Sequence, residues 1–283
     1  MASLGAVARA VEHECVCFAS FEGEDGPREL QGLLFRPAAA GARPAAAVVA
    51  MHGCGGLYAK TGELTGRHRQ WAEVLTAAGY VVLFVDSFRP RGLREICTQK
   101  ARTIRQSRER TRDAFAGLRY LAGRPDVDGA RVGLLGWSHG AGSVLFALRE
   151  GAGRGLELAH DFAAAVAFYP GCSALGAAAY RPRAPILLLV GEADDWTPAE
   201  PCVEFVGQAR AAGAAIDLRL YPGAHHYFDA PDLAVKTREG LATPPEGRAT
   251  VGTHPEARRD ALARVPEFLS RHLNGGNPWT APC

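Results

Sequence analysis

A serine between two glycines is the first feature of the sequence that could do chemistry. It lies in residues 136–140 (GWSHG), after the apolar run 132–135 and before the small residues 141–143. A Gly-x-Ser-x-Gly segment between a buried strand and a helix holds the serine hydroxyl on a sharp turn above the sheet. The glycines allow neighbouring backbone to approach closely. The motif therefore predicts Ser138 as a nucleophile.

A serine hydroxyl is a weak nucleophile at neutral pH and needs a base within hydrogen-bond reach. Two later segments, 191–198 (GEADDWTP) and 222–229 (PGAHHYFD), each follow an apolar strand and supply an acid and a histidine. The order serine, acid, histidine is that of α/β-hydrolases. Spacing alone leaves each role between two neighbours, which are Asp194 or Asp195 for the acid and His225 or His226 for the base.

Over nearly its whole length the chain resembles the dienelactone hydrolase family of α/β-hydrolases. The resemblance is carried by residues 52–56 (HGCGG), 86–92 (DSFRPRG), 136–140, 169–172 (YPGC), 191–198 and 221–229. It implies Asp194 as the acid and His226 as the base. One departure matters, because the enzymes that named the family use a cysteine nucleophile and this chain has Ser138. A serine favours ordinary ester or lactone hydrolysis and puts the dienelactone substrate in doubt.

Two backbone N–H groups are needed to stabilise the oxyanion of a tetrahedral intermediate. We expect one from His139, which follows the nucleophile, and the other from the glycine-rich turn 53–55, with Cys54 as first choice. Cys54 is also a rival nucleophile, but no histidine motif is assigned to it. The side chains of His52 and His139 are expected to pack rather than to catalyse, and His225 either lines the pocket or is structural.

Several aromatic and basic residues lie near the expected ends of strands and are candidates for substrate contact. They are Tyr58, Phe88, Arg89, Arg91, Trp196 and Tyr227. An arginine at position 89 or 91 could bind a substrate carboxylate, although an ion pair with a neighbouring loop is an equal alternative.

Strands and helices alternate along the chain, which predicts an α/β fold with a mostly parallel sheet covered by helices on both faces. An antiparallel pair is expected at 14–21 and 30–36. Apolar strands are expected at 45–51, 80–86, 131–136, 162–169, 186–191 and 216–221. Helices are indicated around 71–78, 115–121 and 262–273, the last kinked or interrupted at Pro266. We expect one domain, 1–283, with a long surface loop at 230–254.

The composition excludes several classes of protein. The formal net charge of +2 gives no general attraction to nucleic acid or to anionic membranes. Apolar runs such as 185–190 are far shorter than the ~18 residues of a membrane helix, and residues 1–15 lack the apolar segment of a signal peptide. Five arginines in 102–112 favour a solvated helix face over a phosphate site.

Seven cysteines without a CxxC pair are more typical of free thiols in a reducing cytoplasm than of a disulfide framework or a zinc site. A bond between Cys172 and Cys202 is the less favoured alternative. The richness in Ala, Gly and Arg suggests a bacterial source. No metal or organic cofactor is expected.

These features predict a serine hydrolase that cleaves a carboxylic ester or lactone through an acyl-enzyme on Ser138. One alternative is a cyclase, acyltransferase or lyase that uses the same residues. Another is a non-catalytic protein that binds a small ligand on this fold. We expect a small-molecule substrate and a monomer or homodimer.

Overall fold

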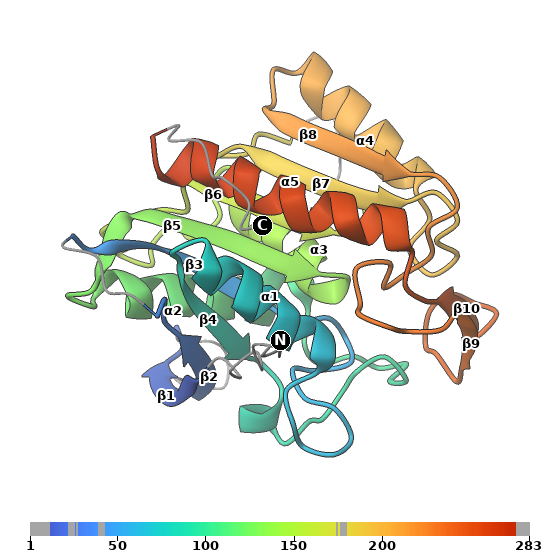
Figure 1. The fold of residues 1–283 in the computed structure, drawn as a ribbon, viewed down its shortest axis with the longest axis horizontal. Helices are drawn as coiled ribbons and strands as arrows, with labels where there is room; N and C mark the ends of the chain where they lie inside the picture. The colour runs from blue at the N-terminus through green and yellow to red at the C-terminus, as the bar shows by residue number, and fades with distance from the viewer. Residues whose placement is uncertain are drawn as a thin grey trace, which may run out of the picture.

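The computed structural model describes residues 12–21, 26, 28–38, 43–173, 175 and 180–275. Its main feature is an eight-stranded sheet with the strand order β1-β2-β4-β3-β5-β6-β7-β8 (Figure 1). The strands are β1 His13–Ala19, β2 Glu29–Phe35, β3 Ala45–Met51, β4 Val81–Asp86, β5 Val127–Trp137, β6 Ala164–Phe168, β7 Ile186–Gly191 and β8 Ile216–Tyr221. β2 is antiparallel to β1 and β4, and all other pairs are parallel.

Central strands are apolar on both faces because helices cover both faces. Every residue of β4, β6 and β7 is buried, whereas β8, at the edge, alternates between buried and more exposed positions. Continuous burial is typical of a parallel sheet between two helical layers. The expected mostly parallel α/β sheet is confirmed, although strand limits differ by a few residues from those predicted.

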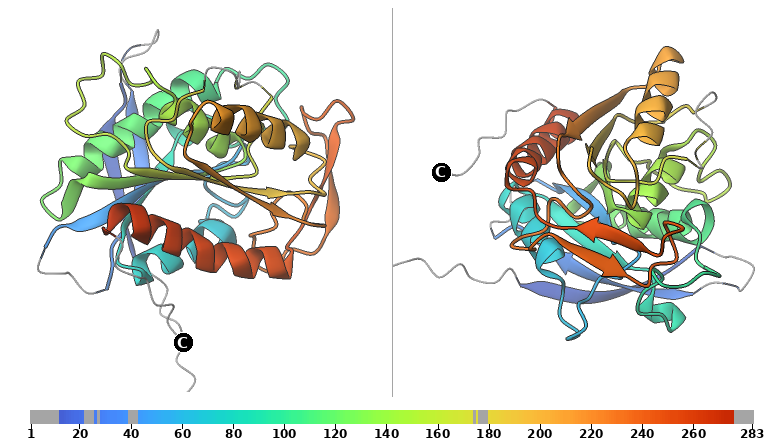
Figure 2. Two further views of the ribbon diagram at one scale, coloured as in Figure 1. Left: turned by 90° about the horizontal axis from the view of Figure 1, so that it is seen from above. Right: turned by 90° about the vertical axis from the view of Figure 1, so that its right-hand side faces the viewer.

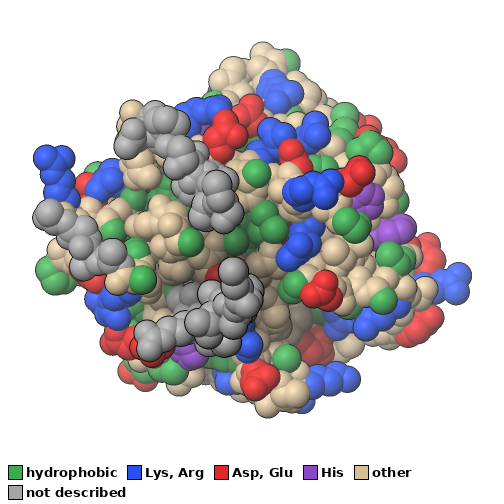
Figure 3. All heavy atoms as spheres, viewed as in Figure 1, with side chains coloured by type: hydrophobic (Ala, Val, Ile, Leu, Met, Phe, Trp, Pro, Cys, Tyr) green, Lys and Arg blue, Asp and Glu red, His purple; other side chains and the backbone are tan. Residues whose placement is uncertain are grey.

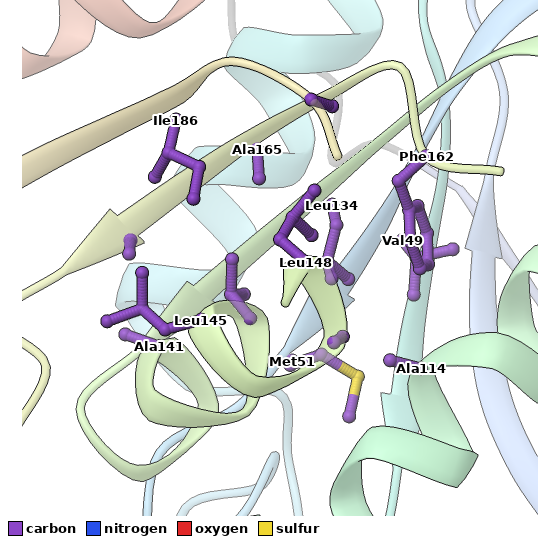
Figure 4. Packing of buried hydrophobic residues seen from close by; sticks show 14 of the residues in the cluster. Val49, Met51, Ala114, Leu134, Ala141, Leu145, Leu148, Phe162, Ala165 and Ile186 are labelled. Carbon is purple, nitrogen blue, oxygen red and sulfur yellow. The ribbon is translucent and has the colours of Figure 1, made fainter. Parts of the chain in front are cut away.

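In the part of the chain that the structure describes, five α-helices form the two layers (Figure 2). α1 Gly66–Ala77 and α5 Pro255–Leu273 cover one face, and α2 Thr111–Ala122, α3 His139–Leu148 and α4 Glu200–Ala211 cover the other. Each face has its own hydrophobic core. Figure 4 shows part of the core beneath α2 and α3, where Leu145 and Leu148 pack over the sheet. α5 is one continuous helix through Pro266, so the interruption that was expected there does not occur.

The segment 230–254, expected to be an irregular loop, contains a small antiparallel sheet. Its strands are β9 Lys236–Glu239 and β10 Arg248–Val251. They lie beyond the carboxyl ends of β7 and β8 (Figure 1). Together with the irregular stretch after β4, this segment builds a third, smaller hydrophobic cluster that includes Cys54, Cys97 and Trp196.

Two expectations based on charge and on cysteine count are wrong. The arginine run 102–112 is not a solvated helix face, because it contains a π-helical turn, Gln106–Arg110, and Arg110 is fully buried. Four cysteines are not free thiols but form the disulfides Cys54–Cys97 and Cys172–Cys202. The thiol argument for a reducing cytoplasm therefore no longer holds, and the location stays a prediction. Cys15 and Cys17 are free and exposed.

Basic and acidic side chains are intermixed on the face shown in Figure 3, in keeping with the small net charge of +2. No helix in the described part of the chain is both long and apolar enough to cross a membrane.

Candidate active site

Ser138 occupies the turn between β5 and α3, with φ 52° and ψ −117°. A non-glycine residue in this region costs on the order of 1–3 kcal/mol, and such strain is often found at functional sites. The flanking glycines are required by space. A Cβ on Gly136 would lie 2.6 Å from backbone atoms of Gly140, and one on Gly140 would collide with the carbonyl oxygen of Met51. The sequence therefore folds here into a tight turn that lifts the hydroxyl above the sheet.

Asp194 and His226 form a buried pair. The Nδ1 of His226 donates to Oδ2 of Asp194 at 2.7 Å. Oδ1 of Asp194 accepts the backbone N–H groups of Trp196 and Thr197, each at 2.9 Å, and Thr197 Oγ1 lies 3.0 Å from Oδ2. These bonds fix the carboxylate, and the bond from Nδ1 leaves Nε2 as the free acceptor that a general base needs.

The neighbouring acid and histidine are engaged elsewhere. Asp195 accepts the backbone N–H and the hydroxyl of Thr250 at 2.7 and 2.9 Å. Nδ1 of His225 bonds the carbonyl oxygen of Ala193 at 2.8 Å. The structure thus brings together Asp194 and His226 and not the other two.

No hydrogen bond joins Ser138 to His226 in this structure. Nε2 of His226 is buried and has no hydrogen-bond partner among the described residues. Catalytic hydrogen bonds are often long in the absence of substrate and tighten when substrate binds. The ring of His226 is held between Tyr169 and Trp196, with ring centroids 4.4 and 4.8 Å away.

A cavity of about 250 Å³ opens at Ser138. Cys54 and His139 also line it, and within the described chain their backbone N–H groups donate to no other atom. Both amides are thus available to an oxyanion. The remaining wall includes Arg102, Gln106 and Thr243. Sequence reasoning did not assign these three to the site. Arg102 and Thr243 lie in irregular segments and Gln106 begins the π-helical turn, and none of them belongs to a motif.

One buried histidine, His52, supports the turn that carries Cys54. Ser87 N–H donates to Nε2 of His52 at 3.2 Å, so Nδ1 carries the proton and donates to the Gly53 carbonyl at 2.8 Å. Burial, reinforced by Arg110, lowers the pKa of His52 well below 6.5 and keeps the ring neutral. Nη2 of Arg110 donates to the His52 carbonyl at 2.6 Å. Burial, with Arg110 and Arg102 nearby, also lowers the pKa of His139 to about 2.

Only one of the six expected substrate contacts lines the cavity, and that is Trp196. Tyr227 does not line the cavity but packs near this residue, with its ring centroid 5.8 Å from that of Trp196 and 4.9 Å from that of His226. Phe88 is buried and packs edge-on against His52 at 4.5 Å.

The two expected arginines point elsewhere. The guanidinium of Arg89 lies over the ring of Tyr58 at 3.4 Å, and both residues line a separate small hollow. Arg91 makes a bidentate ion pair with the buried Asp113, with distances of 2.8 and 2.9 Å. The ion-pair alternative therefore holds for Arg91, and Arg102 is the arginine in the cavity wall.

The buried carboxylate of Asp229, which sequence reasoning also missed, supports the site through Tyr169. Asp229 accepts hydrogen bonds from the indoles of Trp71 and Trp137, each at 2.8 Å, and from the hydroxyl of Tyr169 at 2.6 Å. Nη1 of Arg67 donates to the same hydroxyl at 3.0 Å. Because Tyr169 packs on His226, this network fixes one side of the imidazole. In the sequence, Asp229 is marked only by its place at the end of the histidine segment 222–229.

The fold and the residues above define an α/β-hydrolase. The sequence model of the dienelactone hydrolase family matches residues 30–273, and the chain belongs to this family. Members of this family are hydrolases of the ester and lactone type, which is the class to which this chain belongs.

A curated relative from Bradyrhizobium sp. is 28% identical over 227 residues, which are 73% of this chain and 81% of the relative. It is described as a "Probable 2-oxo-3-(5-oxofuran-2-ylidene)propanoate lactonase". A dienelactone hydrolase-like promiscuous phosphotriesterase from metagenomic libraries has a TM-score of 0.64 at 17% identity, covering 92% of this chain and 98% of that one. Thermogutta terrifontis esterase 2 has a TM-score of 0.63 at 18% identity, covering 97% of each chain. These two likenesses concern the fold alone.

Proposed function

We propose that this protein is a serine hydrolase that cleaves a short carboxylic ester or lactone through an acyl-enzyme. The observation that carries the proposal is the buried Asp194–His226 pair, 2.7 Å apart. Asp194 accepts the N–H groups of Trp196 and Thr197, and these two residues line the cavity that contains Ser138. Acyl transfer by a serine requires a histidine that is oriented by a carboxylate, and Asp194 orients His226 in this way.

The proposed reaction has two steps. Nε2 of His226 takes the proton of Ser138 as Oγ attacks the carbonyl carbon, while Asp194 stabilises the imidazolium. The N–H groups of Cys54 and His139 hold the oxyanion. The intermediate collapses to an acyl-enzyme, and His226 gives its proton to the leaving alkoxide. Water, deprotonated by the same Nε2, then attacks the acyl carbonyl carbon. The second intermediate breaks its bond to Oγ of Ser138, which takes the proton back from Nε2 as the acid is released.

The cavity supports a small substrate with a negative charge. Its volume of about 250 Å³ lies just below the roughly 300–1,000 Å³ of pockets for drug-sized ligands. Burial lowers the pKa of Arg102, and the charge of Glu95 partly offsets that effect, so an anionic substrate group beside this guanidinium would be stabilised. The name of the Bradyrhizobium relative specifies a propanoate, which carries such a carboxylate. We therefore propose a carboxylate-bearing ester or lactone.

Neighbouring residues provide matched controls for the test. Turnover of p-nitrophenyl acetate is compared among wild type, Ser138→Ala, His226→Ala, Asp194→Asn, His225→Ala and Asp195→Asn. The first two variants should lose kcat by on the order of 10⁴-fold, and Asp194→Asn should also be severely impaired. His225→Ala and Asp195→Asn should stay within a few fold of wild type. Equal losses in His225→Ala and His226→Ala would contradict the assignment of the base.

Mass spectrometry distinguishes the alternatives. An acyl-enzyme on Ser138 that is released by water supports hydrolysis. An acyl-enzyme that is released only by an added alcohol or amine would instead indicate an acyltransferase. Tight retention of the ester without an adduct would indicate a ligand-binding protein.

A further inference from the structure

The disulfide Cys54–Cys97 is attached directly to the proposed oxyanion hole. Cys54 lines the cavity, and its N–H is one of the two available donors. Its side chain is bonded to Cys97, and both residues are buried. The covalent bond therefore joins a residue that would touch the reacting oxygen to a segment 43 positions later in the chain.

Three contacts hold that later segment against the turn 53–56. The N–H of Ile96 donates to the carbonyl of Cys54 at 2.8 Å. Gly56, at φ +85°, has no room for a Cβ because the carbonyl oxygen of Arg94 lies against it. The third contact is the disulfide itself. Of these three, only the disulfide fixes the side chain of Cys54.

The segment 92–105 is weakly supported by regular structure. It contains no helix or strand, and all of it lies in the described part of the chain. Its buried and partly buried hydrophobic residues belong to the third cluster, apart from the two main cores. The carbonyl of Cys97 accepts the N–H of Ala242 at 2.8 Å, so the same segment also carries the loop that contributes Thr243 to the cavity. Small clusters beneath long loops are less stable than a main core.

We propose that the Cys54–Cys97 disulfide is a positioning element of the oxyanion hole, so that hydrolytic activity depends on its being oxidised. The proposal rests on the proposed serine hydrolase function. A dithiol such as dithiothreitol would give two electrons and two protons to the S–S bond, leaving two protein thiols and a cyclic disulfide of the reagent. Cys54 would then keep the backbone hydrogen bond from Ile96 but lose its covalent bond to Cys97.

The consequence falls on the transition state more than on substrate binding. The N–H of Cys54 bonds a charge that develops only in the tetrahedral intermediate, so its displacement lowers kcat and leaves KM nearly unchanged. Removing one oxyanion donor altogether costs on the order of 10²–10³ in kcat. For a donor that is loosened rather than removed, we expect about a tenfold loss.

The second disulfide gives a matched comparison. Cys172–Cys202 also has one cysteine in the cavity wall. It joins the chain after β6 to α4, and Sγ of Cys202 lies 3.4 Å from the carbonyl oxygen of Pro170. The effects of the two bonds can be separated by measuring wild type, Cys97→Ser and Cys202→Ser, each before and after dithiothreitol.

The experiment measures kcat and KM for the neutral ester p-nitrophenyl acetate, per site titrated with a fluorophosphonate. Alkylation and mass spectrometry count the reduced cysteines, and circular dichroism checks the fold. Calorimetry measures the affinity of a short trifluoromethyl ketone, which forms an oxyanion on serine without turnover. Cys97→Ala is a second variant in case Cys97→Ser does not fold.

We expect reduction to lower kcat about tenfold in wild type and in Cys202→Ser, with KM within about twofold. Cys97→Ser should start at the lower kcat and not respond to the reductant, and ketone affinity should fall in parallel with kcat. Unchanged kcat in Cys97→Ser or in fully reduced wild type would overturn the proposal. Oxidised wild type that binds the ketone but hydrolyses no ester would contradict the proposed function, and the ketone affinity would still test the disulfide.

Discussion

At the scale of single residues, three arginines near the site make different contacts although their side chains are chemically the same. Arg89, Arg91 and Arg102 all belong to the stretch after β4, yet only Arg102 lines the cavity. Arg91 is neutralised by Asp113 and Arg89 stacks on Tyr58. Nε of Arg102 donates to the carbonyl of Ile96 at 3.0 Å, which directs its side chain without neutralising it.

Arg102→Gln should therefore impair anionic substrates selectively. Losing a charge-assisted hydrogen bond costs roughly 1.5–3 kcal/mol, so we expect KM for mono-p-nitrophenyl succinate to rise at least tenfold. KM for the uncharged p-nitrophenyl butyrate should change little. Arg105→Gln, which removes an exposed arginine from the same run, is the control. An equal loss for both esters in Arg102→Gln would show that Arg102 does not recognise charge.

At the scale of elements, one carboxylate joins three parts of the fold. Asp229 receives hydrogen bonds from Trp71 in α1, Trp137 at the end of β5 and Tyr169 just after β6. Its own segment carries His226. Asp229 thereby fixes the positions of the helix, the nucleophile strand and the histidine loop relative to one another. Because its hydrogen bonds form one buried network, the loss of one bond affects the others.

Asp229→Ala should be strongly destabilising because it leaves three buried donors without their acceptor. Each such donor costs about 1–3 kcal/mol, and we expect a loss of at least 3 kcal/mol in the free energy of unfolding, measured with urea. Trp71→Phe removes one donor and keeps most of the packing, so its loss should be clearly smaller. A loss in Asp229→Ala no larger than that in Trp71→Phe would contradict this role.

The elements that the sequence predicts best are those with a local pattern. The turn at Ser138 can be predicted from a few neighbouring residues, namely the apolar strand before it and the two flanking glycines. The glycines are required because the turn leaves no room for a Cβ at positions 136 and 140. Asp194 and His226 were chosen by resemblance, since spacing could not separate them from their neighbours. Arg102 could not be found, because its place depends on how an irregular segment folds over the sheet. The burial of Arg110 also depends on tertiary contacts, as does the pairing of Cys54 with Cys97.

At the scale of the whole molecule, buried histidines make stability depend on pH. Burial is the main cause that lowers the pKa of His52 and His68 well below 6.5 and that of His139 to about 2. Below pH 6.5 the unfolded chain binds protons at these positions and the folded chain does not. Their contribution to stability is therefore complete above pH 6.5 and is lost as the pH falls below it.

The free energy of unfolding should thus fall from pH 7 to pH 5.5, with each histidine contributing up to about 1.4 kcal/mol per pH unit. Asp86 acts in the opposite sense, because burial raises the pKa of its carboxyl. Burial also lowers the pKa of His272, so one carboxyl opposes four imidazoles. Urea unfolding at both pH values measures the slope. His139→Gln should make the slope smaller by up to about 1.4 kcal/mol per pH unit, since glutamine does not titrate, whereas His13→Gln, at an exposed position in β1, should not. Equal slopes in the two variants would show that His139 is not held neutral in the folded protein.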